Sequence, residues 1–456
     1  MAGINENGRG GWEQRTWLVL GIVTFVGGFQ QVYLKWLYPF FGYYGFENSY
    51  PKIGYLVLAW GLSVAPAVWM PIRLKRPSQL IYWVLYLTVF IPSMFVPLYV
   101  GLREATEVAS MMVTLFVGFA ITGMSYYLPL LGFHPPSISP RAYKRLAFGV
   151  VAGLVLWVFV VFRGNFRIVS FADVYDLRSG ADDIMAGSSV HYAVMWLSAV
   201  IGPFLMAGGI VRKRIPMFLA GVLVQVFVYS TMGAKSVIVS IMVVPLLAFI
   251  LRDKGASFGL KVSWSCALLT LVLYLGRSFG GSESLFFWLF SLVFMRTFGI
   301  TGLNTAWYHD FFLRNPPTYY SHIKPVSWFV IYPYNNPLGI EVGSFYSGDP
   351  TLDANAHFWA TDGLAAWGLW GILVVSVVCA LVFWVLDSTA NGHDLRLTAL
   401  MVSFVAMNLA NISLFTSLLS GGLGFLMIFL YLAPRQYAES VNARIGCPVM
   451  TPLVQP

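Results

Sequence analysis

Two polar segments of this 456-residue chain hold the side chains best suited to chemistry. Segment 163–190 contains Arg163 and Arg167 among several aspartates, and segment 277–363 contains three of the six histidines, His309, His322 and His357. Carboxylates and imidazoles are the usual general acids and bases, while arginine and lysine are the usual partners of phosphate. An acid–base or anion-binding site is therefore expected in these two segments.

The longer segment is also dense in aromatic and amide side chains, with Trp328 and the run Tyr332–Asn336. Aromatic faces beside amide, carboxylate and imidazole groups are usual partners of sugar rings, whose hydroxyls take hydrogen bonds. Such groups together with cations fit a sugar that is linked to phosphate. The alternative is a folded loop with solvated charges and no ligand.

Motifs for cofactors and metals are missing from the sequence. It has no GxxxxGK[ST] phosphate loop, no GxGxxG after a strand and no HExxH. The histidines of the longer segment lack zinc-site spacing, and Cys266, Cys379 and Cys447 suggest neither a disulfide framework nor a metal cluster. The sequence therefore predicts no metal and no cofactor.

The elements that must position these residues are membrane helices. The chain is 58% hydrophobic and 10% charged, whereas a soluble domain carries roughly 25% charged residues. Its apolar residues form blocks of ~17–25, the length at which a helix spans the hydrocarbon core. We expect one all-α polytopic membrane domain over 1–456, with about twelve helices near 16–34, 53–71, 80–101, 108–132, 146–162, 191–211, 216–232, 236–251, 259–276, 364–386, 397–415 and 420–433.

The distribution of Lys and Arg predicts the orientation. Strict alternation from a cytoplasmic N-terminus places the basic runs 73–76, 141–145, 212–214 and 252–254 inside, as the positive-inside rule requires. The +9 net charge is thus a topology signal and not a nucleic-acid patch. Both termini are then cytoplasmic, and the segments 163–190 and 277–363 are extracytoplasmic loops.

Four cations fall at the outer membrane face in this topology: Arg163, Lys235, Arg277 and Arg296. Each could snorkel toward lipid head groups, as Lys and Arg do near helix ends. Their convergence with three histidines instead favours a site for an anionic head group, such as that of a lipid-phosphate-linked sugar. The apolar stretch 285–295 is too short to span and is expected to be an interfacial or re-entrant helix.

Three stretches carry a resemblance to a known family: Met232–Ser236 (MGAKS), the long outer loop with its Pro/aromatic/Asn run, and ANAHFWATDGLAAWGLWGI at 354–372. Over roughly residues 163–384 the chain resembles the bacterial O-antigen and exopolysaccharide repeat-unit polymerases of the flippase-dependent pathway. This resemblance implies a glycosyltransferase-C-like membrane enzyme of the inner membrane with its active site on the periplasmic side.

The resemblance also implies the reaction and its residues. A growing glycan would move from undecaprenyl pyrophosphate to the non-reducing end of a new lipid-linked repeat, without metal or nucleotide sugar. A chain-length regulator protein and membrane lipids are the other implied partners. The acid–base candidates are His322, Glu341, Asp353 and His357. The substrate-binding candidates are Arg163, Arg167, Lys235, Arg277, Arg296, Lys324, Tyr334 and Asn336.

Three other functions compete with this one. An O-antigen ligase would have a similar site and different acceptors. A lipid-linked oligosaccharide flippase would place ionisable or helix-breaking residues at mid-membrane, whereas here the helix interiors are nearly free of charge. A scaffold without chemistry is the third alternative, and the clustered Arg, His and carboxylate residues weigh against it.

Overall fold

The computed structural model describes residues 9–134, 136, 138–167, 181, 184–185, 188–253, 255–279 and 285–435. Within these ranges every regular element is a helix. Ten helices are long and apolar enough to cross a membrane, so the chain is an all-α polytopic membrane protein, as the sequence predicts. They are Gly11–Tyr44, Ser78–Val100, Ala105–Tyr127, Pro140–Val161, Val190–Val211, Ile215–Met232, Lys235–Asp253, Phe258–Gly276, Trp359–Ala390 and Leu414–Leu432.

Two further apolar helices, Ile53–Val68 and Leu395–Leu409, are shorter than a span. They occupy the two remaining positions at which the sequence predicts helices. Pro66 lies in the 3₁₀ turn that ends the first of them, and the second is divided at Val402. Proline removes a backbone donor, which explains why the first helix stops early.

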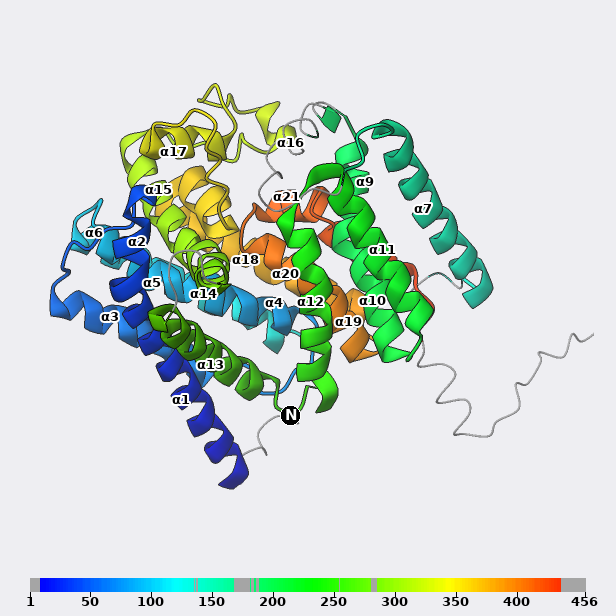
Figure 1. The fold of residues 1–456 in the computed structure, drawn as a ribbon, viewed down its shortest axis with the longest axis horizontal. Helices are drawn as coiled ribbons and strands as arrows, with labels where there is room; N and C mark the ends of the chain where they lie inside the picture. The colour runs from blue at the N-terminus through cyan, green and yellow to red at the C-terminus, as the bar shows by residue number, and fades with distance from the viewer. Residues whose placement is uncertain are drawn as a thin grey trace, which may run out of the picture.

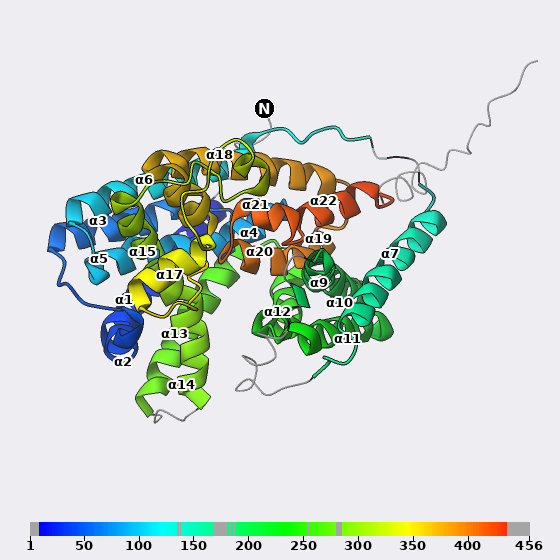
Figure 2. The ribbon, with the colours of Figure 1, turned by 90° about the horizontal axis from the view of Figure 1, so that it is seen from above.

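The helices form two groups with a third between them (Figure 2). The first group contains α1 (Arg9–Val32), α2 (Tyr38–Phe41), α3 (Ile53–Val64), α4 (Ser78–Leu85), α5 (Ile91–Val100), α6 (Ala105–Met124), α13 (Phe258–Phe279) and α18 (Ala365–Ala390). The second contains α7 (Pro140–Val161), α9 (Val190–Trp196), α10 (Gly202–Val211), α11 (Ile215–Met232) and α12 (Lys235–Ile250). Between them lie α19 (Leu395–Met401), α20 (Ser403–Leu409), α21 (Leu414–Leu419) and α22 (Leu423–Leu432), with α20 contacting α4 and α19 contacting α10.

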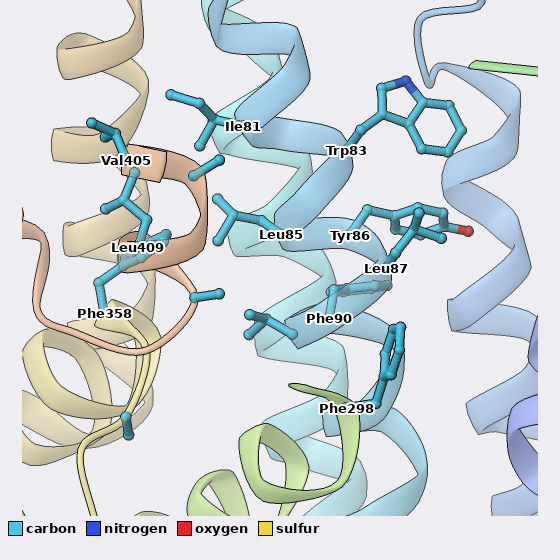
Figure 3. Close-up of a cluster of buried hydrophobic side chains, with 14 of the residues drawn as sticks. Ile81, Trp83, Leu85, Tyr86, Leu87, Phe90, Phe298, Phe358, Val405 and Leu409 are labelled. Atoms are coloured by element: carbon cyan, nitrogen blue, oxygen red, sulfur yellow. The ribbon is translucent and has the colours of Figure 1, made fainter. Parts of the chain in front are cut away.

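The core is centred on α4 and the π-helical turn η4 (Tyr86–Phe90) that continues it. Figure 3 shows Leu85 directed toward Val405 and Leu409 of α20, while Phe90 lies near Phe298. All of these side chains are buried. Because lipid is as apolar as these residues, close packing holds the helices together here, and not escape from water.

The helix predicted over 285–295 is longer than expected. α14 (Leu285–Phe290), the π-helical segment η8 (Ser291–Gly299) and α15 (Ile300–Arg314) follow one another without a break. The last of them is buried from Thr301 to Phe311 and packs on α5. Much of the segment expected to be loop is therefore part of the helical core.

The rest of that segment lies at one end of the bundle. It contains the short helices α16 (Lys324–Ser327) and α17 (Leu338–Ser347), and Figure 1 shows them at the end where α7 and α9 also approach each other. It leads into the π-helical turn η9 (Trp359–Leu364) and α18. This end of the molecule therefore holds much of the longer polar segment, together with the described ends of the shorter one at 163–167 and 188–190.

Candidate functional site

A buried carboxylate and a histidine meet beneath the polar loop. His322 Nε2 lies 3.0 Å from Asp362 Oδ1. The hydroxyl of Ser413 donates to the same oxygen at 2.7 Å, and the amide of Leu414 donates to Oδ2 at 2.7 Å. Asp362 is fully buried. Three donors therefore compensate the cost of holding this carboxylate away from water.

Asp362 is positioned by a helical hairpin. The backbone leaves helical geometry at Trp367 (φ −155°, ψ 33°) and Gly368 (φ 59°, ψ −141°). The short arm before this kink folds back on the long arm, so that Trp359 Nε1 donates to Ser376 Oγ at 2.9 Å. A Cβ on Gly371 would overlap the carbonyl of Gly363, which explains glycine at this crossing. The short arm thus brings Asp362 into the protein interior.

The end of the short arm also anchors His322. Backbone amides of Thr318 and Tyr319 donate to the carbonyls of Ala365 and Ala366 at 2.8 and 2.9 Å. Thr318 Oγ1 then lies 3.0 Å from Nδ1 of His322. Both ring nitrogens have partners, and the tautomer with hydrogen on Nε2 leaves Nδ1 as the acceptor.

Tyr320 adds a third polar group beside the pair. Its ring centroid lies 6.3 Å from that of His322, and its buried hydroxyl has no hydrogen-bond partner among the described residues. Burial, and then the charge of Asp362, raises the pKa of Tyr320 to about 12. The hydroxyl therefore remains a proton donor at neutral pH.

The backbone of this turn is strained. Tyr319 and Tyr320 have φ angles of 47° and 64°, in the left-handed region that residues other than glycine rarely adopt. Each such residue costs on the order of 1 kcal/mol or more, and such strain gathers at functional sites. The hydrogen bonds to Ala365 and Ala366 hold the turn in this conformation.

A second buried carboxylate fixes the neighbouring helices. Asp310 of α15 contacts Arg103 Nε at 2.6 Å and Arg314 at 2.9 Å, and it accepts from the hydroxyl of Tyr346 at 2.5 Å. These partners come from the turn before α6, from α15 itself and from α17. The network therefore ties the loop helix α17 to the membrane helices.

The predicted acid–base candidates lie in different surroundings. His322 belongs to the buried pair described above. Glu341 accepts from Asn336 Nδ2 at 3.1 Å on α17, and Asp353 accepts from the side-chain amide of Asn355. His357 is fully buried, with Nε2 at 2.8 Å from Thr305 Oγ1. Only His322 among them is joined to a second titratable group by a described hydrogen bond.

The predicted substrate-binding residues come from several separate elements. Arg163 and Arg167 are exposed, and the Arg167 amide donates to the carbonyl of Ser230 at 3.0 Å. This contact places Arg167 against the last turn of α11, five residues before Lys235, the first residue of α12. The exposed side chains of Arg296 and Lys324 lie on η8 and α16.

Three other candidates complete the predicted set. The Tyr334 hydroxyl donates to the carbonyl of Pro316, and Asn336 holds Glu341 as described. The side chain of Arg277 lies outside the described residues, although its backbone belongs to α13. The structure therefore brings Arg167 against the end of α11, and it places Tyr334, which follows the His322 turn in the chain, against Pro316, which precedes that turn.

The sequence reasoning did not select Asp362, Ser413 or Tyr320 as site residues. Asp362 lies inside one of the quoted stretches, where a single carboxylate within an apolar block is a usable signal. Ser413 and Tyr320 carry no such signal, because their place depends on how distant segments fold together.

No protein-family model, no curated protein and no solved structure matches this chain. Within the described residues no group of three or more His, Cys, Asp or Glu side chains could hold a metal ion.

Proposed function

We propose that the chain is a membrane glycosyltransferase that polymerises lipid-linked oligosaccharide repeat units. One observation carries the proposal: the Asp362–His322 pair, buried on a helical hairpin and covered by a loop rich in aromatic and amide side chains. A carboxylate that orients an imidazole is a common general-base arrangement. Aromatic and amide groups around it suit sugar rings.

The pair suggests how the proton would move. The acceptor sugar hydroxyl would replace the Thr318 hydroxyl at Nδ1 of His322 and give up its proton there. Its oxygen would form a bond with the anomeric carbon of the donor glycan as the bond to pyrophosphate breaks. The electron pair would leave with undecaprenyl pyrophosphate. Asp362 would stabilise the imidazolium, and it would remain a carboxylate.

The cations supply the other half of the proposed chemistry. Arg163 and Arg167 lie close together in the chain, and the amide of Arg167 donates to Ser230, five residues before Lys235. Positive charge near the leaving pyrophosphate would stabilise the charge that develops in the transition state. This arrangement requires neither metal nor nucleotide sugar.

The proposal includes a location. The basic turn 212–214, between α10 and α11, lies at the opposite end of the bundle from α16. With positive charge inside, the site would face the periplasm of a bacterial cytoplasmic membrane, and both termini would be cytoplasmic. A chain-length regulator protein is a further proposed partner at the outer face.

A reconstitution assay tests the proposal. Purified protein in nanodiscs would receive the undecaprenyl-pyrophosphate repeat unit of its source strain, with EDTA and without nucleotide sugar. We expect a ladder of glycans from the native chain and from His134→Gln, whose side chain is exposed at a distant turn. We expect no ladder from His322→Gln, provided that it is folded.

Other outcomes of this assay distinguish the polymerase from the alternative functions. Absence of a ladder with the native protein and an authentic donor would overturn the polymerase proposal. Transfer of finished glycan to a lipid A core acceptor would identify a ligase. Movement of the lipid-linked sugar across vesicles without a new glycosidic bond would identify a flippase.

A further inference from the structure

A pocket of about 250 Å³ lies beside the kink of the helical hairpin, and none of its lining residues belongs to the Asp362–His322 pair. It is lined by α6, α15 and the kinked start of α18, and α18 contacts both of the other helices (Figure 2). Its lining is largely apolar and includes Phe312, Leu364 and Leu369, together with three polar residues, Glu107, Ser110 and His309.

His309 is the residue that suggests a ligand. Its side chain is only 4% exposed, it lines the pocket, and it makes no hydrogen bond with any described residue. By contrast, the next residue, Asp310, has three partners. The missing hydrogen bond therefore concerns the imidazole and not its neighbour. An imidazole that lines a pocket without a protein partner can exchange a hydrogen bond with a bound group.

Glu107 offers a second acceptor in the same pocket. Its carboxylate lies 3.9 Å from Arg103, at the limit of an ion pair, and its side chain is 42% exposed. Arg103 instead makes its short contact, 2.6 Å, with Asp310. Glu107 therefore retains capacity for a cationic donor from outside the chain.

The pocket lies at the depth of lipid head groups. Glu107 is in the first turn of α6, which begins one of the membrane-spanning helices. Trp367 and Trp370, next to the pocket on α18, are exposed. Tryptophan is enriched where a membrane meets water, and charged residues are tolerated at this level.

The kink keeps this space open. Gly368 lines the pocket, and a Cβ added to it would meet no atom within 4 Å. Its φ of 59° is one that side chains rarely permit. The conformation that folds the hairpin back thus also creates the pocket.

We propose that this pocket binds a phospholipid with a primary ammonium head group. The ammonium would donate to Glu107 and to His309, and the first methylenes of the lipid would lie on Phe312, Leu364 and Leu369. A quaternary ammonium carries the same charge but has no N–H to donate. The proposal goes beyond the glycosyltransferase proposal and does not depend on it.

Native mass spectrometry of the full-length protein tests this. Delipidated protein in detergent would be titrated with dioleoyl phosphatidylethanolamine, phosphatidylcholine or phosphatidylglycerol. We expect the ethanolamine lipid to bind about tenfold more tightly than either of the others, because one charge-assisted hydrogen bond contributes that much. Equal retention of the ethanolamine and choline lipids would overturn the proposal.

Substitutions locate the site. Glu107→Gln should lower the affinity for the ethanolamine lipid about tenfold, whereas Glu104→Gln, an exposed carboxylate three residues earlier, should leave it unchanged. Ser110→Phe should lower it as well by filling the pocket from its exposed rim. Native-like affinity in both pocket variants, after their melting curves show folded protein, would contradict the assignment.

Discussion

Asp362 is a buried carboxylate within an apolar stretch of sequence. The cost of burying it is offset by three hydrogen-bond donors from two other parts of the chain. His322, Ser413 and the Leu414 amide approach it from the loop and from the start of α21. Each of these contacts is ordinary alone. Their convergence on one buried carboxylate, beside an unpaired tyrosine hydroxyl, is what distinguishes the site from a solvated loop.

Tyr320 permits a test that separates chemistry from stability. Its buried hydroxyl has no described partner, so Tyr320→Phe should leave the melting temperature unchanged or raise it slightly. If the hydroxyl donates to substrate, the same variant should lose about tenfold or more in glycan transfer. Melting curves and the ladder assay measure the two effects. A variant that is destabilised and fully active would contradict this role.

At the scale of elements, the site depends on a helical hairpin that returns into the protein. The apolar block after Trp359 predicts a helix, because about twenty apolar residues in sequence have few alternatives in a membrane protein. The return at Gly368 could not be predicted, since it depends on the contact of Gly371 with Gly363 and of Trp359 with Ser376. Neither contact leaves a periodic signal in the sequence.

Gly371→Ala tests whether this crossing positions Asp362. A Cβ at Gly371 has no room against the carbonyl of Gly363, so we expect the short arm to shift and transfer to fall at least about tenfold. Gly149→Ala on α7 has open space and is the matched control. Activity would be measured together with trypsin resistance. Native activity in Gly371→Ala would show that the crossing is not needed.

The length of the helical stretch from Leu285 to Arg314 could not be predicted from the sequence, for a related reason. Polar residues such as Asn304 and Asp310 lower its hydropathy, although each finds a partner inside the fold. Those partners, Asn355 and Arg103, come from distant segments. Sequence alone shows the polar residue but not the group that satisfies it.

The Asp310 network predicts which of its two arginines contributes more to the stability of the fold. Arg103, with a side chain 21% exposed, should matter more than Arg314, which is 53% exposed. We expect Arg103→Gln to cost about 2 kcal/mol and lower the melting temperature by several degrees, because it leaves a buried carboxylate short of a partner. Arg314→Gln should lower it less, since solvent screens an exposed pair.

The exposed Arg145→Gln on α7 is the control for these melting measurements. It should behave as the native protein does. Equal shifts for Arg103→Gln and Arg145→Gln would contradict the role of Asp310 as a structural tie between α15, α17 and the turn before α6.

At the scale of the whole molecule, the sequence predicts the class of fold well and the site only in part. Hydrophobic blocks determine the helices because the bilayer restricts backbone structure, and the basic runs predict an orientation. His322 could be selected as a candidate from its residue type. Its partner Asp362, forty residues later, could not, because the pairing exists only once the loop folds over the hairpin.

Orientation can be measured directly with single cysteines in a cysteine-free background. A membrane-impermeant maleimide should label Ser327→Cys, exposed on α16, in intact spheroplasts. It should label Lys213→Cys, exposed in the turn between α10 and α11, only after lysis, because basic turns remain inside. The reverse pattern would place the proposed site in the cytoplasm.

The most direct test of the proposed site replaces a side-chain carboxylate by a neutral amide and measures transfer in the reconstituted ladder assay. Asp362→Asn removes the charge that orients His322, and Asp349→Asn makes the same change at an exposed turn of the same loop. We predict that transfer falls at least about 100-fold in Asp362→Asn and stays native in Asp349→Asn. A folded Asp362→Asn protein that builds the native ladder would contradict the account.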